Sequence, residues 1–112
     1  DLFHRHGDEV TQHRATRISL GYLRPPAESP AEHQISLSDG DLLVMVTDGV
    51  TDQIGSEPER RKGFGNRRLQ RMLAEAPTDA ATSVKHALLA ALNDWQGKDR
   101  RRDDVSTVII QC

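Results

Sequence analysis

The fold is decided by one stretch, Leu42-Leu43-Val44-Met45-Val46-Thr47-Asp48-Gly49-Val50-Thr51-Asp52. Its five apolar residues run into Thr-Asp-Gly, which predicts a strand that is buried on both faces and ends in a carboxylate. Gly49 would let the backbone turn sharply there, and Asp48 would offer hard oxygen donors suited to Mg²⁺ or Mn²⁺. The plain structural alternative is an Asp-Gly turn at the end of a strand.

A second β-prone run lies near the other end of the chain, where an acidic pair precedes the strand instead of following it. The pair Asp103-Asp104 leads into Val105-Ser106-Thr107-Val108-Ile109-Ile110. If this strand pairs antiparallel with the strand at 42–46, Asp48 and Asp103 come to the same edge of the sheet. A shared metal site needs that arrangement, whereas a charged turn before a strand is the structural alternative.

Four features in order resemble the metal-dependent PP2C-type (PPM) serine/threonine phosphatases, in particular their bacterial SpoIIE/RsbU-like branch. The stretch from Gly40 to Asp52 is similar to the central motif of that family, and residues 103–110 are similar to its closing motif. Between them, Gly63-Phe64-Gly65-Asn66 resembles a Phe-Gly pair before a helix, and Ile18-Ser19-Leu20-Gly21 resembles a Leu-Gly pair upstream. No single feature is specific, but their order across nearly the whole chain is.

The resemblance implies which residues would hold metal. In the family, the Asp of Thr-Asp-Gly and the first Asp of the closing pair are direct metal ligands, which are Asp48 and Asp103 here. Asp104 stands where some relatives have Asn and is expected to support the site, as are Asp52 and Gly49. The complete domain would hold two Mg²⁺ or Mn²⁺ ions roughly 3.5–4 Å apart, and a metal-bound water, instead of a side chain, would attack the phosphate.

The composition is that of one small domain. With 112 residues, 36% of them hydrophobic and 29% charged, the chain could bury a modest core. Its 15 basic and 17 acidic residues give a net charge of −2, which offers no general attraction to nucleic acid. No apolar run is long enough to span a bilayer, and the single Cys112 excludes a disulfide framework and fits a reducing compartment. We expect a cytoplasmic location.

The first half of the chain predicts antiparallel strands. Residues 1–6 and 9–14 flank a turn at Gly7-Asp8, and the histidines of this hairpin, His4 and His6, are expected to face solvent because zinc ligands at a fixed spacing are missing. Three prolines between positions 25 and 30 predict a loop. Residues 33–37 alternate and predict another strand.

The second half predicts two amphipathic helices. A polar loop from Ile54 to Gly65 carries Arg60-Arg61-Lys62, either as a solvated run or as a contact for a phosphorylated partner. Asn66 is expected to cap a helix ended by Pro77, and Thr78-Asp79 a helix ended by Gly97. The expected core stripes are Leu69, Met72, Leu73 and Ala76, and then Val84, Ala87, Leu88, Ala91, Leu92 and Trp95. The fold class is therefore α+β, with an antiparallel β-sheet packed against two amphipathic helices, as part of a PP2C-like α/β/β/α sandwich.

In the family, the N-terminal half of the domain carries another metal-binding acidic pair, with its own Asp-Gly motif and a Gly-His-Gly motif. No counterpart of these precedes the central motif here. Residues 1–112 are therefore expected to form the C-terminal portion of a single phosphatase domain, with unpaired strand edges and exposed apolar faces. We expect this portion alone to be inactive and to associate with itself.

Two hypotheses follow for the function. The first is a phosphoserine/phosphothreonine phosphatase of a bacterial signalling pathway, whose partner is a phosphorylated regulator like an anti-sigma-factor antagonist. In that branch the parent proteins often carry sensory or inner-membrane-anchored segments upstream. The alternative is a non-catalytic, phosphatase-like module that binds a partner protein. Complete acidic motifs upstream in the parent gene would favour the first hypothesis, and their loss would favour the second.

Overall fold

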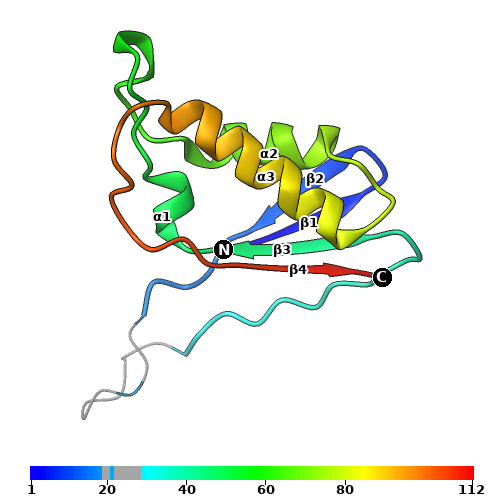
Figure 1. The fold of residues 1–112 in the computed structure, drawn as a ribbon. Helices are drawn as coiled ribbons and strands as arrows, with labels where there is room; N and C mark the ends of the chain where they lie inside the picture. Colours follow the sequence, from blue (N-terminus) through cyan, green and yellow to red (C-terminus); the bar gives the residue numbers. More distant parts are fainter. Residues whose placement is uncertain (19–20, 22–28) are drawn as a thin grey trace.

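The computed structural model describes residues 1–18, 21 and 29–112. It consists of a four-stranded antiparallel sheet that two helices cover on one face (Figure 1). The order of the strands across the sheet is β2-β1-β3-β4, so the strand at the end of the chain lies beside the central stretch. The elements in chain order are β1 (Leu2–His6), β2 (Glu9–His13), β3 (Leu42–Val46), α1 (Asp48–Thr51), the 3₁₀ helix η1 (Pro58–Arg60), α2 (Gly65–Glu75), α3 (Ala81–Gln96) and β4 (Thr107–Gln111).

The predicted N-terminal hairpin is confirmed. Strands β1 and β2 pair antiparallel from Leu2 opposite His13 to His6 opposite Glu9. The turn between them has Gly7 at a φ of 58°, a left-handed conformation that costs glycine little. Strand β3 then pairs with β1 on one side and with β4 on the other, both antiparallel. The antiparallel pairing that would bring Asp48 and Asp103 to the same edge of the sheet is therefore present.

The core lies between the inner face of the sheet and the two helices. Phe3, Leu42 and Val44 point from the sheet into it, and they meet buried side chains of α2 and α3. The α+β fold class is confirmed, because a strand that alternates with period two and helices with apolar stripes can bury one face each only against one another. The helix residues of the core are Leu69, Leu73, Val84, Leu88, Leu92 and Trp95.

A buried arginine joins the sheet to the end of α2. Arg5 of β1 donates hydrogen bonds from its guanidinium to the carbonyls of Leu73 (2.8 Å) and Ala76 (2.7 Å), and from Nε to Gly7 (2.7 Å). These bonds satisfy carbonyl groups that the last turn of a helix leaves without partners. The position of α2 over the sheet is therefore set by a polar contact as well as by apolar packing.

The prediction that the central strand is buried on both faces was wrong. Leu42 and Val44 are buried, but Met45 is 43% exposed, and on β4 Val108 and Ile110 are 51% and 48% exposed. The helices cover only one side of the sheet, as Figure 1 shows. The apolar residues of both faces suit a sheet with a second layer, whereas the described residues supply a layer on one face.

Three local predictions also need correction. Residues 33–37 form no strand, because both neighbours of β3 are other strands and the segment buries only part of Ile35. Helix α2 begins at Gly65, before the predicted cap Asn66, and α3 begins at Ala81 after Ala80, with no side-chain cap at either start. The polar loop contains the unpredicted helix η1.

Some of the remaining predictions are confirmed, and others concern residues outside the described part of the chain. Helix α2 ends before Pro77 and α3 ends before Gly97, as predicted, and Trp95 belongs to the core. The Leu-Gly feature at 18–21 and the proline-rich loop fall largely on positions 19–20 and 22–28, which lie outside the described residues. Within the described part of the chain, we find no helix with the length and apolar character needed to cross a membrane.

Candidate functional site

A threonine joins the end of β3 to the segment just before β4. The hydroxyl of Thr47 accepts a hydrogen bond from the Ser106 backbone N–H (3.0 Å) and donates one to the carbonyl of Asp104 (3.1 Å). The backbone N–H of Thr47 also donates to the carbonyl of Ser106 (3.0 Å). The segment before β4 is therefore fixed to the residue that directly precedes Asp48.

Gly49 allows this close approach. A Cβ atom at position 49 would overlap the backbone carbonyl of Asp104, so a larger residue would push the two segments apart. We predicted that a glycine is needed at position 49 for a sharp turn, and this explanation was wrong. Gly49 lies in the helical backbone of α1 and its φ is negative. What the position requires is the absence of a side chain.

Asp48 and Asp52 lie at the two ends of the helical turn that follows β3. Asp48 is the first residue of α1 and Asp52 caps its last turn, and both are exposed. Both line an open cavity of about 450 Å³ together with Thr51, Asn66 and Arg17. The short helix α1 was not predicted, and it is what places two carboxylates four residues apart on one cavity.

Asp103 and Asp104 lie beside this cavity without lining it. Both are exposed, in the segment that leads to β4. The carboxylate of Asp103 accepts a hydrogen bond from the backbone N–H of Asp104 (2.7 Å), while the carbonyl of Asp104 accepts the Thr47 hydroxyl. The fold thus brings the two predicted acidic segments together at one end of the sheet, and Asp104 makes its contact through the backbone.

Two lining residues of the cavity were missed by sequence reasoning. Asp1 begins the chain at the same end of the sheet, and Figure 1 shows the N-terminus next to the end of β3. Arg17 comes from the loop after β2 and is the only basic side chain among the described lining residues. It makes no ion pair with a carboxylate of the described residues. A lone arginine in a loop carries no sequence signal that it lines a cavity.

The donor chemistry of the cavity fits a hard divalent cation. Carboxylates supply the oxygen ligands that Mg²⁺ and Mn²⁺ prefer, and Asp48 and Asp52 are exposed and accessible from the cavity. Within residues 1–18, 21 and 29–112, however, no three His, Cys, Asp or Glu side chains converge closely enough to hold an ion. The described residues therefore offer part of a coordination sphere.

The aspartate at the other end of β3 has a different environment. Asp41 is buried and accepts hydrogen bonds from His4 Nε2 (2.8 Å), His6 Nδ1 (2.7 Å) and the Ser38 backbone N–H (3.0 Å). The bond from Ser38, followed by those from His4 and His6, lowers the pKa of Asp41 from 3.8 to about 2. The prediction that both histidines face solvent was wrong for His4, whose side chain is 14% exposed.

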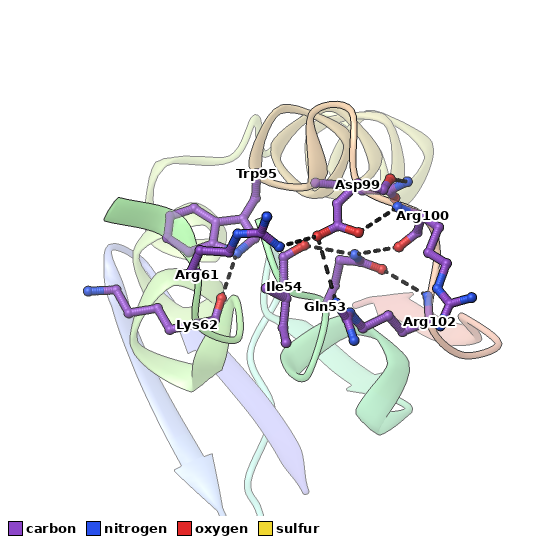
Figure 2. Close-up of polar contacts among 9 residues, drawn as sticks. Gln53, Ile54, Arg61, Lys62, Trp95, Asp99, Arg100 and Arg102 are labelled. Carbon is purple, nitrogen blue, oxygen red and sulfur yellow. Dashed lines mark hydrogen bonds and ion pairs between the residues drawn. The ribbon is translucent and has the colours of Figure 1, made fainter. Parts of the chain in front are cut away.

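Both arginines of the basic run form ion pairs within the molecule, and its lysine contributes a backbone carbonyl. Arg60 pairs with Asp94 (3.0 Å) and Arg61 with Asp99 (3.4 Å), and the carbonyl of Lys62 accepts the indole N–H of Trp95 (3.2 Å; Figure 2). These contacts attach the loop to the C-terminal end of α3. A contact of this run with a phosphorylated partner stays a prediction.

Comparison with protein families gives one match that spans nearly the whole chain. The family model described as Stage II sporulation protein E (SpoIIE) matches residues 2–112. Comparison with curated protein sequences gives no significant match.

Comparison with solved structures gives strong matches to phosphatase domains. The SiaA-PP2C domain of Pseudomonas aeruginosa is 27% identical with a TM-score of 0.84, over 99% of this chain and 42% of that one. The phosphatase domain of SpoIIE from Bacillus subtilis is 20% identical with a TM-score of 0.67, over 98% of this chain and 45% of that one. A longer SpoIIE structure, with a fragment of the regulatory domain, has a TM-score of 0.74 at 20% identity, over 99% and 31%. The chain spans less than half the length of each of these structures, and the matches at 20% identity speak to the fold alone.

Proposed function

Because the chain belongs to the SpoIIE family of PP2C-type phosphatase domains, we propose that it forms the C-terminal portion of a metal-dependent phosphoprotein phosphatase. The observation that carries the proposal is the junction of β3 and β4, where Thr47 and Gly49 hold the Asp103–Asp104 segment against the residues around Asp48. In this proposal Asp48 and Asp103 are metal ligands and Asp52 and Asp104 support them.

The substrate is a phosphoserine or phosphothreonine side chain of a regulatory protein. A phosphate monoester dianion repels anionic groups, so carboxylates alone would exclude it from the cavity. Bound Mg²⁺ or Mn²⁺ ions would neutralise that charge and acidify a water. Arg17, on the same cavity and without an ion pair to a described carboxylate, supplies a guanidinium whose donors match phosphate oxygens.

The remaining ligands come from outside the described residues in this proposal. Two carboxylates leave most of the six oxygen positions of Mg²⁺ to water, which gives weak affinity. The chain also spans less than half of the phosphatase domains that it resembles. We therefore expect weak metal binding and no phosphatase activity for residues 1–112 alone. A version extended upstream would bind metal tightly and hydrolyse a phosphoserine peptide.

Calorimetric titration of Mn²⁺ tests the proposal directly. We would titrate residues 1–112 and the extended version, each with and without Asp48→Asn, because Asn keeps the shape of Asp but removes its charge. Asp39→Asn is the matched control, since Asp39 is an exposed aspartate at the far end of β3. We expect tight binding only in the extended chain, lost in Asp48→Asn and kept in Asp39→Asn. No binding in either version would reject the metal site and favour a non-catalytic partner-binding module.

A further inference from the structure

Gln53 is a polar side chain that is fully buried, with an exposure of 1%, one residue after Asp52. Burying a primary amide is costly unless its donors and acceptor are paired. The groups that the Gln53 amide contacts therefore show which part of the fold it holds in place.

The amide of Gln53 bonds to the segment that leads to Asp103. Its Nε2 donates to the carbonyls of Ile54 (2.9 Å) and Arg100 (3.1 Å), and its Oε1 accepts the backbone N–H of Arg102 (3.4 Å). Figure 2 shows the side chain reaching from the segment after α1 to the backbone of this loop. One side chain thus fixes the loop at two backbone positions, 100 and 102.

The same loop is held a second time just beyond the acidic pair. Thr47 bonds to the backbone of Asp104 and Ser106, so Asp103 lies between two points of attachment. Both points, Thr47 and Gln53, belong to the segment that also carries Asp48 and Asp52.

Asp99, just before Arg100, adds charged contacts at the start of this loop. The carboxylate of Asp99 accepts the Arg100 backbone N–H (2.8 Å) and pairs with Arg61 (3.4 Å) and Arg102 (3.7 Å). Asp99 is 14% exposed, but the side chains of Arg61 and Arg102 are 64% and 42% exposed. Ion pairs with such exposed side chains contribute little to stability. The buried amide of Gln53 is the stronger constraint on the backbone.

We infer that Gln53 is a positioning residue, which holds the Asp103 segment at a fixed distance from Asp48 so that the two carboxylates serve one metal centre. The inference rests on the proposed function for its purpose, although the attachment itself does not depend on a metal. Groups that orient metal ligands without touching the ion commonly change metal affinity 10- to 100-fold when they are replaced.

Two variants remove the attachment in different ways. Gln53→Met keeps a similar volume but loses all three hydrogen bonds, and Gln53→Glu keeps the shape while placing a carboxylate against two carbonyls. Gln111→Met is the matched control, because Gln111 also donates one side-chain bond to a backbone carbonyl, that of Thr78 (2.8 Å), at the opposite end of β4.

The first measurement is amide hydrogen exchange of the metal-free chain by NMR. In Gln53→Met we expect the amides of Asp104 and Ser106 to exchange about fivefold faster or more relative to the rest of the sheet, the change expected from losing one net hydrogen bond. In Gln111→Met these two amides should follow the rest of the sheet. Equal behaviour of the two variants would overturn the inference. If Gln53→Met does not fold, Gln53→Glu decides by the same comparison.

The second measurement is paramagnetic broadening of amide signals by added Mn²⁺. In the unaltered chain the amides of residues 48–52 and 103–104 should broaden over the same range of Mn²⁺ concentration. In Gln53→Met the amides of 103–104 should require about tenfold more Mn²⁺ while those of 48–52 change less, and an unchanged titration would count against a positioning role. Without any broadening in the unaltered chain, the titration is repeated in the version extended upstream. No broadening there rejects the proposed metal site, whereas hydrogen exchange still decides whether Gln53 holds the loop.

Discussion

At the scale of single residues, the two ends of β3 carry aspartates with opposite properties. Asp41, before the strand, is buried and its carboxylate accepts three hydrogen bonds, whereas Asp48, after the strand, is exposed on a cavity. A carboxylate whose oxygens are all engaged stabilises the fold, and one whose oxygens face an open cavity is free to bind a ligand. The same residue type therefore has a structural role at one end and a candidate functional role at the other.

The first prediction concerns acid stability. The folded-state pKa of Asp41, about 2, lies below its ordinary value of 3.8, so its contribution to stability is complete above about pH 4 and is lost as the pH falls toward 2. Asp41→Asn should therefore be less stable than the unaltered chain at neutral pH, with a smaller difference at pH 2. Denaturant unfolding followed by circular dichroism between pH 2 and 7 measures this.

The neighbouring Asp39 provides the control for this experiment. It is exposed, on the same turn as Asp41. Asp39→Asn should follow the unaltered chain at every pH. A pH dependence in Asp41→Asn as steep as that of the unaltered chain would show that other groups dominate acid unfolding.

At the scale of elements, α3 supplies much of the core and contacts α2. Its buried stripe runs through Leu88 and Leu92 to Trp95, whose ring meets Phe64 edge to face at 6.1 Å. The guanidinium of Arg68 from α2 lies 4.0 Å from the centre of the same ring. The spacing alone predicts this stripe, because a period of 3.6 residues identifies the buried face of a helix whatever packs against it.

Two adjacent leucines of α3 give the second prediction. Leu88 is 1% exposed and Leu89 is 38% exposed. Leu88→Ala should lower the free energy of unfolding by about 2–5 kcal/mol, because it leaves a cavity in the core. Leu89→Ala should change the free energy of unfolding by no more than about 0.5 kcal/mol. Urea unfolding measures both, and similar losses in the two variants would contradict the packing described here.

At the scale of the whole molecule, the uncovered face of the sheet stands out. Val108 lies opposite Met45 and Ile110 opposite Leu43 in the β3–β4 pair, so apolar side chains adjoin across the two strands. Three of these four are more than 40% exposed. Such a face in water favours association with another apolar surface.

The third prediction is that residues 1–112 associate through this face. Sedimentation equilibrium should give a mass above 12.5 kDa that increases with concentration. Val108→Thr combined with Ile110→Thr should shift the mass toward the monomer, because Thr keeps the β-propensity but lowers the apolar area. Leu89→Gln also replaces an exposed apolar side chain, but on the helix layer, so it is the control and should leave association intact. A monomeric unaltered chain at every concentration would contradict the prediction.

The sequence by itself determined the four strands, the two long helices and the two acidic segments of the candidate site. Period and turn residues identified the hairpin, β3, both long helices and β4, because those signals depend on neighbours along the chain. The motif residues Asp48 and Asp103 were identified through their resemblance to a family. Residues 33–37 alternate as a strand does, but they have no partner in the sheet, which the local pattern could not reveal.

Only the tertiary structure decided how distant residues meet. The spacing around Gly49 is set by the Asp104 carbonyl, the role of Gln53 by a loop 47 residues away, and the place of Arg17 by a cavity shared with β3 and α1. It also decided which face of the sheet the helices cover, since the apolar residues of β3 suited either. The physical reason is that periodicity records whether a side chain is buried, whereas its partner depends on packing between segments that are far apart in the chain.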